Sequence, residues 1–164
     1  HGGLIGVILS TYIFSRTKNL NYKLYFDTIS CVAPIGIFLG RVANFINGEL
    51  YGVPTEKPWG VIFPKIDDSP RHPSQIYEAI LEGVVLFFIL NFLVGKKFFN
   101  HGAISLLFLI LYGIFRIISE QFRQPDEHMG YILGHLSMGS VLSAVMIVLG
   151  ILFLSRLIFN EKNR

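Results

Sequence analysis

The sequence predicts an all-α protein, a polytopic bundle of transmembrane helices that forms one integral-membrane domain over residues 1–164. Of the 164 residues, 52% are hydrophobic and only 15% are charged, whereas about 25% are charged in a typical soluble domain. Several apolar segments approach or exceed the ~18–20 residues that a helix needs to cross roughly 30 Å of hydrocarbon. Lysine and arginine concentrate in alternate connections between these segments, which is typical of a chain that crosses a membrane repeatedly.

Five helical segments are expected, and the last four are long enough to span a bilayer. The first is too short to do so. Because the chain opens on histidine and enters an apolar segment at once, we expect it to be an N-terminally truncated piece of a longer protein. The predicted helices cover residues 1–14, 26–47, 76–95, 102–119 and 133–159.

The basic residues also predict an orientation. They are in excess after the first segment, in the stretch "GKKFFNH" and in the C-terminal tail. Short cytoplasmic loops carry such an excess, so we place these connections and the C-terminus in the cytoplasm. The connections at residues 48–73 and 120–132 offset their basic residues with acidic ones and are predicted to lie outside. The longer one holds five of the seven prolines and the only tryptophan, Trp59. It is either an ordered cap over a site or an interfacial anchor.

Glycine spacing predicts where helices meet. Gly2 and Gly6 in the first segment, and Gly36 and Gly40 in the second, are each four residues apart. In lipid this spacing lets a second helix approach closely enough for backbones to pack. Both pairs are therefore predicted to be helix contact faces.

Two arginines lie within apolar segments, near the ends predicted to face outward. An arginine inside a membrane segment costs ~2.5–3.5 kcal/mol on insertion scales. Arg41 could reduce this cost by extending its side chain to the interface. Arg116 lies at the same depth on another predicted helix, and a pair of guanidiniums suits a bound anion, since the planar fork of donors matches a phosphate diester. A phospholipid head group is the obvious candidate.

Polar residues accompany both arginines. Tyr112 precedes Arg116 by one helical turn, so its hydroxyl could donate to the same anion. Alternatively, Tyr112 belongs to an interfacial aromatic belt and Arg116 pairs with Glu120. Glu78 and Glu82 share a helix face, and the simplest role for a carboxylate such as Glu82 in an apolar span is to orient an arginine.

Other kinds of chemistry find little support in the sequence. The five histidines form no pair at the spacing of helical metal ligands, so no metal site is expected. The single cysteine, Cys31, is most simply a small apolar packing residue. No glycine-rich loop with a lysine is present to bind phosphates. No cofactor and no nucleic-acid partner are expected.

Four stretches of this sequence together resemble the prolipoprotein diacylglyceryl transferase family. They are "HGGLIG", "GRVANFINGELYGVPT", "RHPSQIYEA" and "YGIFRIISEQFRQPD", and the resemblance runs from residue 1 to about residue 139. It implies a seven-helix protein of the bacterial inner membrane with a cytoplasmic C-terminus and its active site towards the outer leaflet. About five of the seven helices would be present here, with residues 48–73 as an ordered periplasmic loop.

The resemblance also implies a reaction, the first step of bacterial lipoprotein maturation. The diacylglyceryl group of phosphatidylglycerol passes to the thiol of a prolipoprotein's lipobox cysteine, and glycerol 1-phosphate is released. Arg41 and Arg116 would be the essential cations and His1 the general base, although a packing role for His1 stays open. The residues predicted to bind substrate are Arg41, Asn44, Glu49, Gly52, Glu78, Tyr112 and Arg116.

A transporter or flippase for an anionic solute or lipid is the alternative, since it too would place arginines within helices. It predicts polar residues near the membrane midplane, whereas here they gather towards the outer ends of the helices. A structural membrane subunit, the third class, would leave both arginines dispensable.

Overall fold

The structure is a computed structural model that describes residues 2–94, 96, 100–124, 131–132 and 136–162. Helices dominate the described residues, which confirms the predicted all-α class. The helices are α1 (Gly2–Thr17), α2 (Tyr22–Asn47), α3 (Ser74–Glu78), the π-helical η1 (Ala79–Val85), α4 (Leu86–Val94), α5 (Ala103–Glu120) and α6 (Met138–Lys162).

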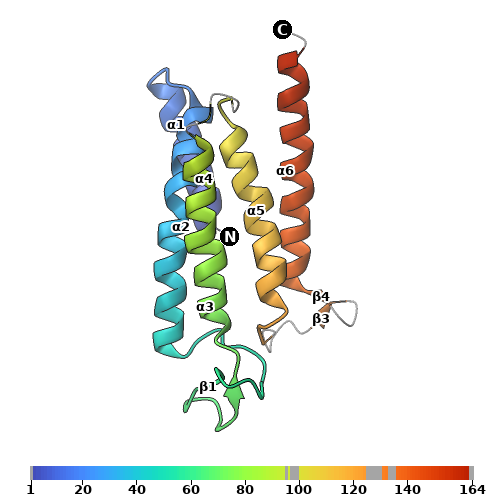
Figure 1. Cartoon of the computed structure of the whole chain (residues 1–164). Helices are drawn as coiled ribbons and strands as arrows, with labels where there is room; N and C mark the ends of the chain where they lie inside the picture. Colours follow the sequence, from blue (N-terminus) through green and yellow to red (C-terminus); the bar gives the residue numbers. More distant parts are fainter. Residues whose placement is uncertain (1, 95, 97–99, 125–130, 133–135, 163–164) are drawn as a thin grey trace.

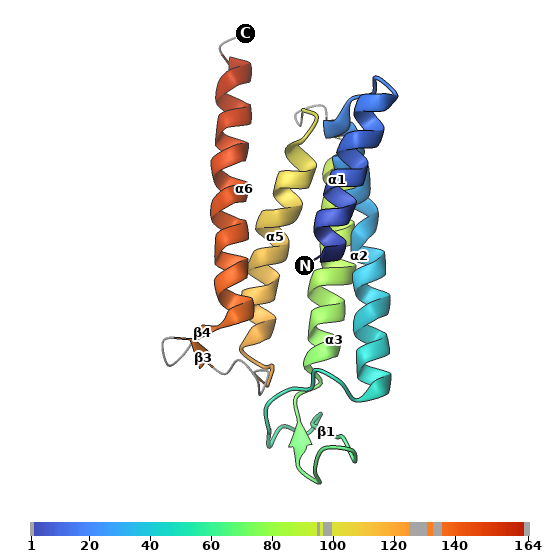
Figure 2. The ribbon, with the colours of Figure 1, turned by 180° about the vertical axis from the view of Figure 1, so that it is seen from behind.

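Four helices among the described residues are long and apolar enough to cross a membrane. One of them is continuous through α3, η1 and α4, and the others are α2, α5 and α6. Figure 1 shows them side by side along a common direction, with α6 at the edge of the bundle beside α5, and Figure 2 shows the same order from behind. The four spans are Tyr22–Asn47, Ser74–Val94, Ala103–Glu120 and Met138–Asn160.

Local signals set the ends of α2. The side chain of Asn21 accepts a hydrogen bond from the backbone N–H of Lys23 and so caps the first turn. Gly48 follows the last turn with φ of +71°, a left-handed conformation that glycine adopts without strain. The chain therefore leaves α2 sharply and enters the long connection to α3.

A small apolar core lies within the bundle. Cys31 of α2 is buried against Leu86, Leu90 and Ile104, which confirms its predicted packing role. The helices α5 and α6 approach each other at Gly113 and Gly150: a β-carbon on Gly150 would lie 2.6 Å from Ile110 Cγ1.

The predicted glycine contact faces are not used within the described chain. A β-carbon built on Gly2, Gly6, Gly36 or Gly40 meets no atom within 4 Å. The close approach of α2 to η1 occurs instead at Gly83, where a β-carbon would lie 2.7 Å from Phe38 Cβ. Spacing identified glycines that could admit a neighbouring helix, but it carries no information on which helix is near.

Asp27 fixes the start of α5 against α2. Its carboxylate is buried and accepts hydrogen bonds from the backbone N–H groups of Gly102, at 2.6 Å, and Ser105, at 2.8 Å. A carboxylate at a helix N-terminus satisfies free N–H groups and interacts favourably with the helix dipole. This contact sets the height of α5 relative to α2, and hence the relative height of the arginines that the two helices carry.

The connection between α2 and α3 is an ordered loop at one end of the bundle (Figure 1). Its short strands β1 (Val61–Ile62) and β2 (Pro70–Arg71) pair antiparallel, with Val61 opposite Arg71. A second small pair, β3 (Tyr131–Ile132) and β4 (Leu136–Ser137), precedes α6.

Gly52 is where this loop crosses two other segments. Its N–H donates to the carbonyl of His72, and it forms an isolated antiparallel bridge with Arg123, just after α5. A β-carbon at position 52 would overlap the carbonyl oxygen of His72 and lie 2.6 Å from that of Phe122. Only glycine leaves room for this crossing.

Replacing Gly52 by alanine is therefore expected to lower the free energy of unfolding by about 1–3 kcal/mol, the usual cost of overpacking a filled site. The β-carbon meets backbone rather than a flexible side chain, so the loop must move away from the end of α5. Gly40→Ala is the matched control, since its added carbon meets no atom within 4 Å. Equal losses in an SDS-unfolding titration of the two variants would contradict this account of Gly52.

Candidate active site

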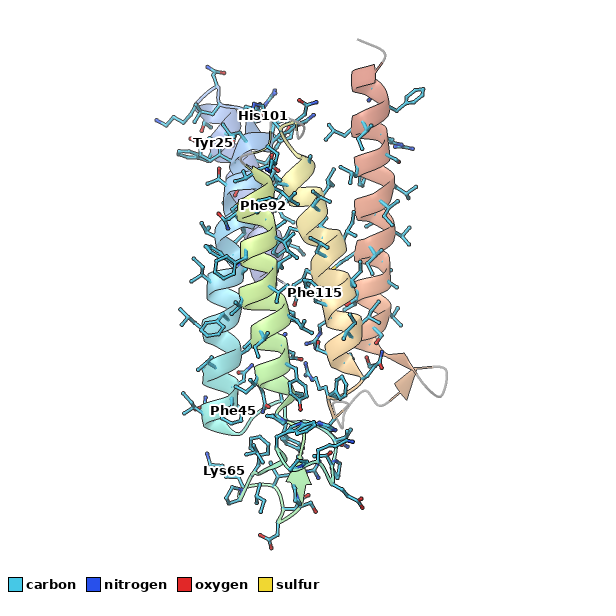
Figure 3. The ribbon with its side chains drawn as sticks, viewed as in Figure 1. Tyr25, Phe45, Lys65, Phe92, His101 and Phe115 are labelled. Atoms are coloured by element: carbon cyan, nitrogen blue, oxygen red, sulfur yellow. The ribbon has the colours of Figure 1, made fainter. Side chains whose placement is uncertain are left out.

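A buried cluster of arginines and glutamates lies at one end of the bundle, where α2 and α5 end and α3 begins. Arg41 comes from α2, Arg116 from α5, and Glu78 and Glu82 from α3 and η1. The two glutamate side chains are 0% exposed, while those of Arg41 and Arg116 are 14% and 12% exposed. The cluster thus joins three of the four spans. In Figure 3 the labels of Phe45 and Lys65 mark this end of the molecule.

Arg41 is held by two carboxylates. Its Nη1 lies 3.0 Å from Glu78 Oε2, and its Nη2 donates to Glu82 Oε2 at 3.1 Å. The side chain therefore turns into the bundle and does not extend to the interface. The two contacts fix the plane of the guanidinium, because they involve two different nitrogens.

Arg116 is held by the same two glutamates and by a third. Its Nη1 contacts Glu78 Oε1 and lies 3.6 Å from Glu82 Oε1, and its Nη2 lies 2.8 Å from Glu120 Oε2. Each carboxylate of Glu78 and Glu82 thus presents one oxygen to Arg41 and the other to Arg116. The pairing of Arg116 with Glu120 and the orienting role of Glu82 are both present in the structure.

The charges of the cluster balance. Arg123 joins it through Nη1, which lies 3.7 Å from Glu78 Oε1, so Arg41, Arg116 and Arg123 face Glu78, Glu82 and Glu120. Compensation of this kind makes buried charge tolerable in an apolar surrounding. A guanidinium has five N–H donors, and the ion pairs above engage only Nη1 and Nη2, so donors remain for a bound anion.

Of the other predicted site residues, Tyr112 lies nearest to the cluster along its own helix. It is one turn before Arg116, packs against the apolar core and stacks on Phe108, with ring centroids 5.7 Å apart. Asn44 follows Arg41 on α2. Its backbone carbonyl accepts hydrogen bonds from the N–H groups of Gly48 and Glu49, and its side-chain amide forms no hydrogen bond within the described residues.

Glu49 and Gly52 are not in the cluster. The side chain of Glu49 is exposed, and its backbone carbonyl accepts a hydrogen bond from Gln75 Nε2 at 2.6 Å. Gly52 serves the loop crossing described above. His1 lies outside the described residues.

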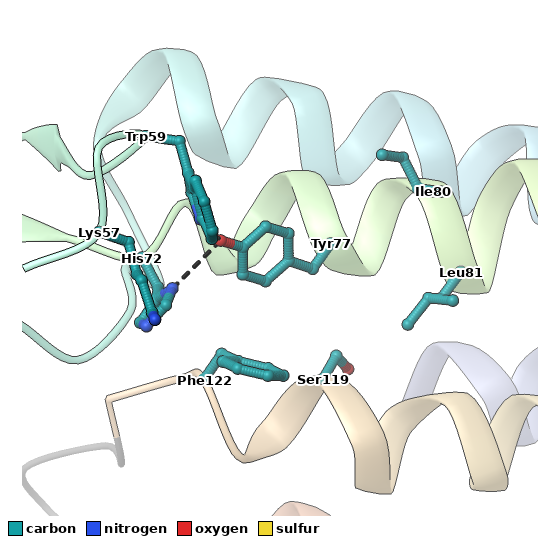
Figure 4. A pocket seen from close by; sticks show the side chains of 8 residues that line it. All are labelled: Lys57, Trp59, His72, Tyr77, Ile80, Leu81, Ser119 and Phe122. Carbon is teal, nitrogen blue, oxygen red and sulfur yellow. Dashed lines mark hydrogen bonds between the residues drawn. The ribbon is translucent and has the colours of Figure 1, made fainter. Parts of the chain in front are cut away.

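An apolar cavity of about 450 Å³ adjoins the cluster (Figure 4). Its walls include Ile80 and Leu81 of η1 and Phe122 just after α5. Ser119 connects cavity and cluster: its side chain lines the cavity, and its Oγ donates to Glu82 Oε1 at 3.2 Å. A ligand could therefore place an apolar part in the cavity and a polar part against the arginines.

The long loop closes part of this cavity. Lys57 and Trp59 of the loop line it together with His72 and Tyr77. Trp59 Nε1 donates to the Tyr77 hydroxyl at 2.8 Å, and His72 Nδ1 lies 3.1 Å from the same oxygen. Figure 4 shows the three rings meeting at that hydroxyl. The structure thus supports the cap role of the loop.

Sequence reasoning did not single out Trp59, His72, Tyr77 or Ser119 as a group. His72 and Tyr77 lie within the stretch "RHPSQIYEA", so the sequence alone indicates that they are near each other. Their contacts with Trp59 and with residues after α5 depend on how the loop folds back, which no local pattern reports.

An ion pair stiffens the loop. Arg71 Nη2 lies 2.6 Å from Asp67 Oδ2, and Arg71 Nη1 donates to the carbonyl of Gly52 at 3.1 Å. The hydrogen bond from Arg71 lowers the pKa of the Asp67 carboxyl below its ordinary value. Because the folded pKa lies below the unfolded value of about 3.9, the pair stabilises the loop fully above that pH and less as the pH falls through the folded pKa.

Asp67→Asn is accordingly expected to increase amide hydrogen exchange in the loop near neutral pH. The difference between parent and variant should shrink as the pH is lowered from about 7 towards 3, since protonation removes the same carboxylate charge in the parent. Asp68→Asn, which neutralises the exposed neighbouring carboxylate, is the control and should change exchange little. A difference that is constant over this pH range would show that the Asp67 charge is not what orders the loop.

Comparison with known proteins shows the family of this chain. The family profile described as prolipoprotein diacylglyceryl transferase matches residues 1–156. A phosphatidylglycerol–prolipoprotein diacylglyceryl transferase of Rickettsia canadensis is 53% identical over 152 residues, which are 92% of this chain and 59% of that protein. A relative of the same name from Desulfotalea psychrophila is 48% identical over 92% of this chain and 57% of its own length.

The chain therefore spans somewhat more than half the length of these curated relatives. The matched region contains Arg41, Arg116 and the two glutamates that bridge them. This chain belongs to the prolipoprotein diacylglyceryl transferase family.

Proposed function

We propose that the full-length protein transfers the diacylglyceryl group of phosphatidylglycerol to the thiol of a prolipoprotein's lipobox cysteine and releases glycerol 1-phosphate. The observation that carries this proposal is the pair of guanidiniums bridged by Glu78 and Glu82 beside an apolar cavity. The names of the relatives, which state a phosphatidylglycerol and a prolipoprotein substrate, support it.

The arginines would act on the leaving group. In the reaction, the thiolate sulfur forms a bond to a glyceryl carbon, and the bond from that carbon to the phosphate oxygen breaks with its electron pair going to the phosphate. The departing phosphate gains negative charge, which preorganised donors in a water-poor site stabilise. Arg41 and Arg116 are preorganised because Glu78 and Glu82 fix their planes.

The reaction also needs a base and a place for lipid. A cysteine thiol with a pKa of about 8.5 is mostly protonated at neutral pH, so a group near the sulfur must take its proton. We assign this to His1, whose ordinary pKa suits a proton acceptor, with Glu78 as the alternative. The apolar cavity lined by Ile80 and Leu81 would receive hydrocarbon of the lipid. No cofactor enters this scheme.

The direct test is transfer itself. The full-length protein, reconstituted with phosphatidylglycerol and a lipobox peptide, should raise the peptide mass by one diacylglyceryl unit. A peptide whose lipobox cysteine is replaced by serine is the control and should gain no mass. Movement of unmodified lipid or solute across the bilayer without any mass gain would instead favour the transporter.

We further propose that the cluster lies towards the outer leaflet of the bacterial inner membrane and that the C-terminus is cytoplasmic. The positive-inside pattern of the connections supports this orientation. A topology reporter inserted in "GKKFFNH" is expected to report the cytoplasm, and one inserted between Asp67 and Pro70 the periplasm. The opposite pair of results would place the cluster at the cytoplasmic face.

A further inference from the structure

A second cavity lies at the end of the bundle opposite the arginine–glutamate cluster. It has a volume of about 430 Å³ and is formed where α2 and α5 begin and α6 ends. In Figure 3 the labels of Tyr25 and His101 mark this end of the molecule. Its lining includes Tyr22, Lys23, Gly102, Ser105, Phe153 and Arg156.

Two cations line this cavity, and no acidic residue is among the described residues that line it. Neither Lys23 nor Arg156 forms an ion pair with any residue that the structure describes. The nearest buried carboxylate, Asp27, accepts the backbone N–H groups of Gly102 and Ser105. The cavity therefore differs in kind from the cluster at the other end, where the charges of arginine and glutamate balance.

The backbone of Gly102 gives Lys23 its position. A β-carbon at Gly102 would lie 3.4 Å from Lys23 Cδ, so the aliphatic stem of Lys23 runs along the start of α5. Arg156 faces the same cavity from the last turns of α6. The two positively charged residues thus line the cavity from two different helices.

Apart from Ser105 and Asn160, the other side chains that line the cavity are apolar or aromatic, and this lining continues onto the exposed surface of the bundle. Phe153 is 51% exposed, and it lies one turn before Leu157, which also lines the cavity. A ligand that fills this site needs an anionic part for the two cations and an apolar part for the wall beneath them. A free phosphate ion meets the first need but leaves the apolar wall uncovered.

We infer that this cavity binds an anionic phospholipid of the surrounding leaflet, with its phosphate between Lys23 and Arg156 and an acyl chain along Phe153. Basic pockets between the ends of transmembrane helices are suited to anionic head groups, because the cations add electrostatic attraction to the apolar contact. The site is separate from the proposed reaction and does not depend on it.

Photo-crosslinking from the cavity wall tests this inference in the full-length protein. A benzoylphenylalanine replaces Phe153, and the protein is irradiated in vesicles of equal parts phosphatidylglycerol and phosphatidylcholine. The head group of each adduct is identified by mass spectrometry. Since each cation contributes about fivefold near an anionic lipid, phosphatidylglycerol adducts should exceed phosphatidylcholine adducts by about 30-fold.

The control position is Ile151, which is 52% exposed, close to the 51% of Phe153, but does not line the cavity. Adducts from position 151 should contain the two lipids in nearly equal amounts. The same ratio at positions 151 and 153 would overturn the inference. Excess inorganic phosphate should leave the preference for phosphatidylglycerol at position 153 unchanged. If phosphate abolishes this preference, the cavity is a site for phosphate ions and not for lipid.

Charge variants complete the test. Lys23→Gln with Arg156→Gln should reduce the ratio at position 153 to that at position 151. Arg16→Gln with Lys18→Gln removes the same charge from exposed positions near this end and should not reduce it. If the preference for phosphatidylglycerol survives Lys23→Gln with Arg156→Gln, these two residues are not the cations that bind the lipid. If both double variants lose the preference equally, it comes from the general charge of the surface and not from this cavity.

Discussion

Arg41→Lys and Arg116→Lys are each expected to lower the rate of diacylglyceryl transfer by about 100-fold or more, the usual loss when a preorganised donor to a developing negative charge is removed. Both substitutions preserve the positive charge. A loss of this size would therefore come from geometry and not from net charge.

The geometric reason lies in the shared carboxylates. Arg41 contacts Glu78 and Glu82 through two different nitrogens, and Arg116 contacts the same two residues. An ammonium is a compact point charge and cannot hold two carboxylates in one plane while offering further donors to a phosphate. We expect lysine at either position to bind one carboxylate and to lose its orientation towards the substrate.

The measurement is the initial rate with a lipobox peptide and phosphatidylglycerol vesicles, on protein whose circular dichroism matches that of the parent. Arg16→Lys is the control: Arg16 is exposed and forms no ion pair within the described chain. It should retain the parent rate. Near-normal rates for both cluster variants would exclude the phosphate-binding role of the arginines.

The helical class could be predicted because its causes are local. Apolar runs long enough to cross a bilayer mark the spans, and two arginines inside such runs stand out in the sequence alone. The helical spacing of Glu78 and Glu82 also placed both carboxylates on one face before any partner was known. These features depend on residues that are near each other along the chain.

The sequence could not predict that the two arginines share the same two glutamates, because this depends on the relative height of separate helices. Asp27 sets that height for α5 through contacts 75 and 78 residues away along the chain. Gly83 shows the same limit, since it admits Phe38 of α2 although no second glycine lies four residues before or after it. The cavity wall around Trp59 likewise requires the loop to fold back over Tyr77.

Glu78→Gln is expected to have the second large effect, on stability as well as on rate. Glu78 is fully buried and contacts Arg41, Arg116 and Arg123. Removing one partner of a buried ion pair costs about 3–5 kcal/mol, because the remaining charge stays buried without compensation. The free energy of unfolding should fall by about that amount in an SDS titration.

Glu120→Gln is the matched control for charge. The carboxylate of Glu120 pairs with Arg116, and its side chain is 9% exposed. Its loss leaves Arg116 in contact with Glu78 and Glu82. We expect a smaller loss of stability than for Glu78→Gln, and equal losses would mean that bridging by Glu78 adds nothing beyond its charge.

Glu78→Asp separates bridging from charge. Aspartate keeps the negative charge but is shorter by one methylene, so one carboxylate can no longer reach Arg41 and Arg116 together. If Glu78 positions the two guanidiniums, Glu78→Asp should recover much of the stability lost in Glu78→Gln while its transfer rate stays low. If Glu78 only compensates charge, stability and rate should recover together, and its role as a positioning residue would be excluded.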